Sequence, residues 1–178
     1  HKVTVYEKRK IGGTLHEASS ADYKKDIKLF INYYEKQAQK YHLNIIQEEA
    51  TYDTIVNGGY DACIIATGGK PRLETGKVTY ALNYLNGEVK FDGENALVIG
   101  GGITGAEVAV ELAKEGKKVT IIEVMDQFLA LPSAVIPAYQ MAVEQAGVKV
   151  ITGHRLDYVD HDQAIIVDRF GNKKELKA

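Results

Sequence analysis

Three glycines at a fixed spacing are the strongest chemical signal in this sequence of 178 residues. Gly100, Gly102 and Gly105 form a G-x-G-x-x-G motif, which follows an apolar stretch and opens a stretch with helical spacing. The first glycine permits a tight turn, the second leaves room for a pyrophosphate, and the third lets helix and strand pack closely. The following helix would add free backbone N–H groups and a positive dipole end. The motif therefore predicts a dinucleotide-binding turn. Its expected cofactor-binding residues are Gly100, Gly101, Gly102, Ile103, Thr104 and Gly105.

An acid at the end of the next predicted strand indicates which nucleotide binds. Glu123 follows Gly105 at a distance close to the roughly 20 residues expected for a ribose-binding acid. A carboxylate there accepts hydrogen bonds from the adenosine 2′-hydroxyl and repels a 2′-phosphate. Because no arginine occurs among residues 124–126, the sequence predicts NADH rather than NADPH. The alternative is a glycine-rich turn that binds no ligand.

A second acid, Glu7, ends a short predicted strand and precedes Gly12 and Gly13. The stretch 3–7 resembles 119–123, which favours two similar nucleotide-binding units in one chain. The glycine turn expected about 20 residues before Glu7 would lie before His1. We therefore expect the chain to begin inside a βαβ unit. The alternative for Glu7 is a solvated charge at the end of a strand.

The elements that would position these residues alternate between strands and helices. In the second half we predict parallel strands and helices followed by a three-stranded β-meander with its turn at Gly171-Asn172. The predicted elements are strand 95–99, helix 106–115, strand 118–123, helix 133–145, strand 148–152, and meander strands 155–159, 164–168 and 174–176. In the first half they are strand 2–7, helix 21–41, strands 43–46 and 60–66, and a connecting helix 79–85. The fold class is therefore α/β, a Rossmann-like parallel sheet with a β-meander.

Two of the first-half elements carry more specific expectations. The continuous apolar run 60–66 is typical of a strand buried on both faces. Along helix 21–41, apolar and aromatic side chains recur at intervals of three or four residues. We expect the tyrosines to form the packed face of this helix and not a surface on which nucleotide bases stack.

Composition excludes several classes of protein. The chain is 45% hydrophobic and 26% charged with a formal net charge of −2, which gives no electrostatic footprint for nucleic acid. No apolar stretch approaches the roughly 18 residues of a membrane helix. Cys63 is the only cysteine, and His16, His42, His154 and His161 have no ligand spacing, so we predict no metal site. A reducing, cytoplasmic setting fits this cysteine count.

The segment Glu7–Thr14 resembles the FAD ribose and pyrophosphate segment of the two-dinucleotide-binding flavoproteins related to glutathione reductase. Ala66-Thr67-Gly68-Gly69-Lys70-Pro71 resembles the crossing from their FAD domain to their NAD domain. This resemblance implies a partial FAD-binding domain over 1–72 and an NAD(P)-binding Rossmann-like domain over 73–178. Leu15 stands where the disulfide reductases have a redox cysteine, so disulfide chemistry is excluded. The implied FAD-binding residues are Glu7, Lys8, Gly12, Gly13, Thr14, Ala66, Thr67 and Gly68.

The runs 21–26 and 33–37 more closely resemble one branch, the C-terminal region of NADH:flavin oxidoreductases akin to 2-enoate reductase, 2,4-dienoyl-CoA reductase and trimethylamine dehydrogenase. The resemblance implies that NADH passes hydride to FAD. It also implies an FMN barrel and a 4Fe-4S cluster in other domains of the same polypeptide, which would carry the electrons to an α,β-unsaturated acid or thioester. In related enzymes the position of Glu107 lies by the hydride-transfer face; the alternative for Glu107 is an acid favoured by the helix dipole.

Two rival functions stay open at this point. One is a different flavoprotein of the same superfamily, such as an NADH oxidase or a ferredoxin reductase. The other is a nucleotide-binding module without redox turnover. We expect the 178 residues alone to bind FAD weakly and not to turn over NADH. FAD is the expected hydride acceptor, and the chain supplies its binding site incompletely, because the expected first glycine turn would lie before His1.

Overall fold

The computed structural model of the chain describes residues 1–69, 78–160 and 162–177. The chain divides into two compact units, His1–Pro71 and Arg72–Ala178, and each is described by itself. Lys70 and Pro71 of the crossing motif, the expected domain boundary at residue 72, and His161 lie outside the described residues.

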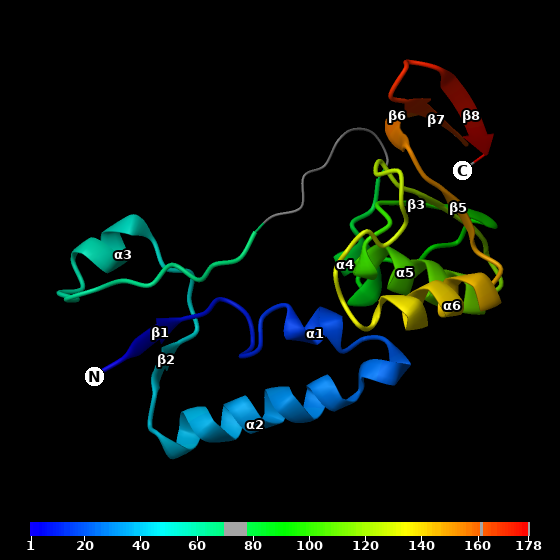
Figure 1. The fold of residues 1–178 in the computed structure, drawn as a ribbon. Helices are drawn as coiled ribbons and strands as arrows, with labels where there is room; N and C mark the ends of the chain where they lie inside the picture. The colour runs from blue at the N-terminus through cyan, green and yellow to red at the C-terminus, as the bar shows by residue number, and fades with distance from the viewer. Residues whose placement is uncertain (70–77, 161, 178) are drawn as a thin grey trace. The chain divides into compact units, whose positions relative to one another are not determined.

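The second unit is built on a parallel sheet that carries the glycine motif. Strands β3 (Asn95–Ile99), β4 (Lys118–Ile122) and β5 (Lys149–Ile151) pair in the order β3-β4-β5. Helix α5 (Ile103–Lys114) connects β3 to β4, and α6 (Ile136–Gln145) connects β4 to β5 (Figure 1). The core between α5 and the sheet is closely packed, because small side chains on the helix, Ala106 and Ala109, are fully buried. The predicted βαβ unit is confirmed.

Two smaller features complete this unit. Helix α4 (Ala81–Leu85), within the predicted 79–85, packs against α5. The predicted meander is also confirmed, as strands β6 (His154–Asp160), β7 (Gln163–Asp168) and β8 (Lys173–Lys177) pair antiparallel in chain order.

The first unit is smaller and more open. Strands β1 (Thr4–Tyr6) and β2 (Asn44–Ile46) pair in parallel, joined by α1 (Leu15–Ala18), a 3₁₀ turn at Asp22–Lys24, and α2 (Asp26–Lys40). A short helix, α3 (Tyr52–Val56), follows β2. The two predicted strands and the long helix are confirmed, whereas α1 and α3 were not predicted. Both are single turns too short to show a period.

The predicted strand at 60–66 is wrong. The run forms neither helix nor strand, and Ile64 and Ile65 are 91% and 83% exposed. A buried parallel strand needs hydrogen-bonded neighbours and helices on both faces, and within the described residues the sheet of this unit has only β1 and β2.

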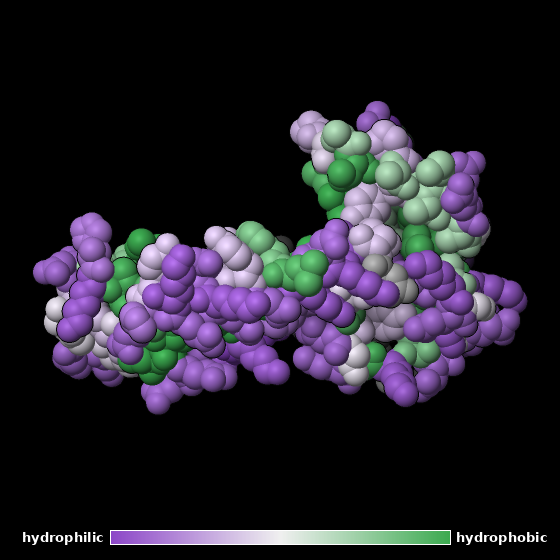
Figure 2. Space-filling view, turned by 90° about the horizontal axis from the view of Figure 1, so that it is seen from below, coloured by the Kyte–Doolittle hydropathy of each residue, from purple (hydrophilic) through white to green (hydrophobic). Residues whose placement is uncertain are grey.

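The expected packing of the tyrosines on α2 is also wrong. Ile31 and Ala38 are buried, but Phe30, Tyr33 and Tyr34 contact one another on the exposed side of the helix. Apolar patches lie open on this unit, at the left of Figure 2. A two-stranded sheet covers only a narrow stripe of the helix, so side chains that follow the helical period still face solvent.

Candidate functional site

The glycine turn has the geometry that a dinucleotide requires. Gly100 has φ +103°, a conformation that strains any side chain, and its N–H bonds to the Ile122 carbonyl at 2.8 Å. A Cβ on Gly105 would lie 1.9 Å from the Gly100 carbonyl oxygen, so only glycine lets α5 approach the turn this closely. The turn therefore brings the start of α5 directly against the end of β3.

Gly102 and the start of α5 fit a pyrophosphate. Gly102 is the N-cap residue in extended conformation, and no side chain caps the helix. Apart from the neighbouring residues of the turn, a Cβ on Gly102 would meet no atom of the described residues within 4 Å, so the space beside its backbone is open. The first N–H groups of a helix have no partner within the helix, and they carry a partial positive charge. An open space beside such groups accommodates a dianionic pyrophosphate.

Glu123 is part of the turn itself. Its side chain is 8% exposed. One carboxylate oxygen accepts the Gly101 N–H at 2.6 Å, and the other accepts the Met125 N–H at 2.7 Å. Glu123 thus ties the glycine turn to the end of β4, a role that the sequence did not predict. Each carboxylate oxygen has a second acceptor site, so the side chain retains the capacity to bind a ribose hydroxyl.

Glu107 lies in the contact between α5 and α6. It is 5% exposed, and the Tyr139 hydroxyl donates to its carboxylate at 2.6 Å. The sequence allowed two interpretations of this residue, an acid near the nicotinamide and an acid placed for structural reasons. The structure shows how the side chain is held, and a catalytic role stays a prediction.

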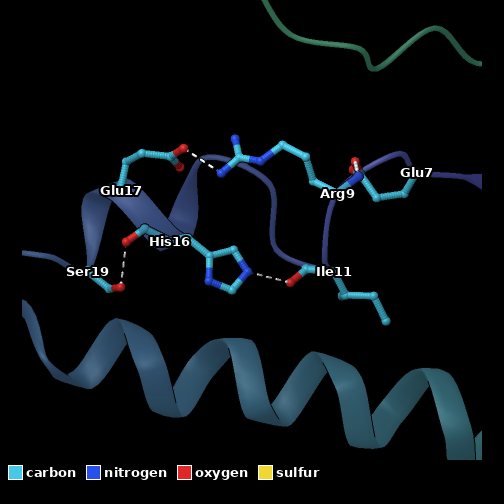
Figure 3. Close-up of polar contacts among 6 residues, drawn as sticks. All are labelled: Glu7, Arg9, Ile11, His16, Glu17 and Ser19. Atoms are coloured by element: carbon cyan, nitrogen blue, oxygen red, sulfur yellow. Dashed lines mark hydrogen bonds and ion pairs between the residues drawn. The ribbon is translucent and has the colours of Figure 1, made fainter. Parts of the chain in front are cut away.

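In the first unit, polar contacts shape the loop that follows β1. The Arg9 N–H donates to the Glu7 carboxylate at 2.8 Å, and the Arg9 guanidinium pairs with Glu17, whose side chain is 3% exposed (Figure 3). His16 Nε2 lies 3.0 Å from the Ile11 carbonyl. These contacts hold the loop between β1 and α1 in place. The loop contains Gly12 and Gly13, both of which have a positive φ.

The remaining residues that were expected to bind FAD lie in several different parts of the first unit. Lys8 forms an exposed ion pair with Glu49 at 2.8 Å, and Thr14 precedes α1. Ala66, Thr67 and Gly68 lie in an exposed stretch without helix or strand. The structure therefore brings Glu7 and the double glycine into one loop, while 66–68 belong to a different segment of the unit.

The Arg9–Glu17 pair was not predicted from the sequence, because an arginine and an acid eight residues apart across a turn share no helical or strand period.

Among the described residues no group of three or more histidine, cysteine or acidic side chains is placed to hold a metal ion. Within the same residues, every helix is too short or too polar to span a membrane.

Arg9→Ala should destabilise the first unit, because it removes the guanidinium from a buried carboxylate. We expect a loss of about 1–3 kcal/mol in the free energy of unfolding, measured by urea denaturation followed by circular dichroism. Lys8→Ala is the matched control, since its ion pair is exposed on both sides and should contribute less than about 1 kcal/mol. Equal losses in the two variants would contradict a structural role for the Arg9–Glu17 pair.

The sequence of the chain is similar to a known protein family and to several named proteins. The family model described as pyridine nucleotide-disulphide oxidoreductase matches residues 2–178. A cinnamate reductase of Clostridium sporogenes is 30% identical over 183 aligned residues, which cover 100% of this chain and 24% of the relative. An NADH oxidase of Thermoanaerobacter brockii is 33% identical over 166 residues, covering 86% of this chain and 25% of the relative.

A solved structure supports the same relationship. A 2-naphthoyl-CoA reductase in complex with 2-naphthoyl-CoA superposes on the whole chain with a TM-score of 0.84 and 27% identity, and the match covers 28% of that protein. The chain thus spans about a quarter of the length of the curated relatives that it matches.

Proposed function

We propose that this chain, which belongs to the pyridine nucleotide-disulphide oxidoreductase family, binds NADH at its glycine turn and presents it to FAD. The family is one of FAD- and NAD(P)-binding domains, and the related named proteins are oxidoreductases. The observation that carries the proposal is the turn at 100–105, with an open space beside Gly102 and a buried acid, Glu123, at its edge.

The residues of the chain would each contribute to binding and orientation. The start of α5 would hold the pyrophosphate, and Glu123 would accept a ribose hydroxyl while bracing Gly101. In the first unit, the loop with Glu7, Gly12 and Gly13 would hold the adenosine half of FAD. When bound, FAD supplies the acceptor for the hydride. Burial of Glu107 against Tyr139 favours its structural interpretation over a catalytic one.

For the whole protein we propose an NADH-dependent reductase of an α,β-unsaturated acid or thioester. Two relatives, the cinnamate reductase and the 2-naphthoyl-CoA reductase, are named for conjugated acids or thioesters. The FMN, the 4Fe-4S cluster and the further domains of the same polypeptide belong to this proposal, as does a cytoplasmic location. The second candidate is an NADH oxidase, which the relative of that name favours. Anaerobic NADH consumption upon addition of an enoate supports the reductase, and NADH consumption that requires oxygen supports the oxidase.

Nucleotide choice tests the site directly. We expect NADH to bind at least about tenfold more tightly than NADPH, because Glu123 repels a 2′-phosphate. In Glu123→Gln, an amide nitrogen replaces one acceptor oxygen, so the affinity for NADH should fall by roughly tenfold. Both affinities are measured by isothermal titration calorimetry.

Glu111→Gln is the matched control for that experiment. Glu111 is on α5 but pairs with Lys114 near the far end of the helix, so its variant should bind NADH like the unmutated protein. Equal or tighter binding of NADPH by the unmutated protein would refute the assignment of Glu123.

A further inference from the structure

The loop after β4 contacts a residue that lies far along the chain. The Arg169 guanidinium, in the turn between β7 and β8, donates to the Asp126 carboxylate at 3.3 Å. Asp126 is three residues beyond Glu123, in the stretch where the sequence contains no arginine. The fold therefore brings a guanidinium to the loop that follows Glu123, although the local sequence there supplies none.

Backbone hydrogen bonds hold the meander against this loop. The Gly153 N–H donates to the Met125 carbonyl at 2.9 Å, and the His154 N–H donates to the Glu123 carbonyl at 3.0 Å. His154 starts β6 and is paired with Asp168, the last residue of β7. Arg169 follows Asp168 directly. Its backbone is therefore tied to Glu123 through two pairings, Glu123 with His154 and His154 with Asp168. Figure 1 shows the meander beside the end of the parallel sheet.

The turn that carries Arg169 is itself well defined. The Asp168 carboxylate accepts the backbone N–H groups of Phe170 and Asn172 at 2.8 and 2.9 Å and the Asn172 side-chain amide at 2.8 Å. The bond from the Asn172 side chain is the main reason why the pKa of Asp168 lies below its usual range. The guanidinium also lies 5.0 Å from the centre of the Phe170 ring, which favours a position close to the turn.

We propose that Asp126 and Arg169 together set the nucleotide preference at the site, an inference that rests on the proposed binding of NADH at the glycine turn. Asp126 pairs with the guanidinium that the fold brings to the loop after Glu123, and it adds a second negative charge three residues beyond Glu123. A guanidinium is well suited to bind a phosphate. The side chains of Asp126 and Arg169 are 72% and 69% exposed, so water weakens their attraction and the pair separates easily. Removing the Asp126 charge therefore leaves Arg169 available to a 2′-phosphate.

The test compares the affinities of NADH and NADPH in Asp126→Asn. We expect the ratio of NADPH to NADH affinity to rise by roughly tenfold, while NADH binding changes little. Adding Arg169→Ala to Asp126→Asn should remove that gain. The two side chains are largely exposed, so both variants are expected to fold, which circular dichroism checks.

Glu94→Gln is the matched control. It makes the same change of charge in an exposed ion pair, Lys118–Glu94, that lies at the opposite end of the parallel strands. A gain in Asp126→Asn no larger than in Glu94→Gln, or a gain that persists without Arg169, would overturn the inference. Failure of the unmutated protein to bind either nucleotide would instead refute the proposed function.

Discussion

Gly102→Val is expected to abolish NADH binding without unfolding the second unit. The valine side chain would occupy the open space beside the Gly102 backbone, where the pyrophosphate is proposed to lie. The affinity for NADH should fall by roughly a hundredfold or more. The backbone of Gly102 is extended, with φ −79° and ψ −174°, so a side chain is tolerated there. The less favourable N-cap residue costs about 1 kcal/mol of stability.

A graded series separates steric exclusion from damage to the fold. Gly102→Ala adds one methyl group in the same direction, and its loss of affinity should lie between those of the unmutated protein and Gly102→Val. Calorimetric titration with NADH gives the affinities, and thermal unfolding gives the stabilities. Normal NADH binding by a folded Gly102→Val protein would show that the pyrophosphate does not lie at this turn.

Gly105→Ala is expected to lower the stability of the second unit strongly, whereas Gly102→Val is expected mainly to lower the affinity for NADH. Its Cβ would lie 1.9 Å from the Gly100 carbonyl oxygen, and a backbone atom cannot move aside like a flexible side chain. We expect a cost of about 3 kcal/mol or more. This exceeds the gain of up to about 1 kcal/mol from replacing glycine by alanine within a helix. The midpoint of thermal unfolding should fall by roughly 10–20 °C.

Gly102→Ala serves as the control for this second prediction, since it makes the same chemical change three residues away in the same turn. Scanning calorimetry of the two variants side by side measures the difference. If Gly105→Ala unfolds at the same temperature as Gly102→Ala, the close approach of α5 to the turn is not a constraint on the fold.

The second unit could be predicted from sequence because its signals are local. Strand 95–99 matches β3 in both bounds, and strand 118–123 differs from β4 by one residue. Each strand lies next to its neighbour in sequence order, joined by one helix, so pattern and pairing agree. The meander is local as well, because each strand pairs with the one that follows.

The first unit was less predictable, because burial depends on partners that a local pattern does not reveal. The run 60–66 has the composition of a buried strand, yet Ile64 and Ile65 are exposed. The aromatic side chains of α2 have helical spacing, yet Phe30 and Tyr33 face solvent. In both cases the pattern indicates which residues are able to pack together, whereas the number of neighbouring strands decides whether they do.

The candidate site shows the same division. The glycines and Glu123 follow a spacing, so they were found in the sequence. The brace from Glu123 to Gly101 and the approach of Arg169 to Asp126 depend on tertiary pairing, the second across 43 residues. The residues next to the proposed ribose-binding acid therefore do not reveal every charged side chain that the fold brings to the same loop.

The exposed run Tyr60–Ala66 has a practical consequence for handling the protein. It contains one charged residue, Asp61, no proline and no glycine, and its isoleucines are exposed. Short segments with high β-propensity and low charge are those from which cross-β assemblies grow. The run also contains the exposed thiol of Cys63, which is available for oxidation between molecules. Within the described chain, aggregation during concentration or storage is expected to start at this segment.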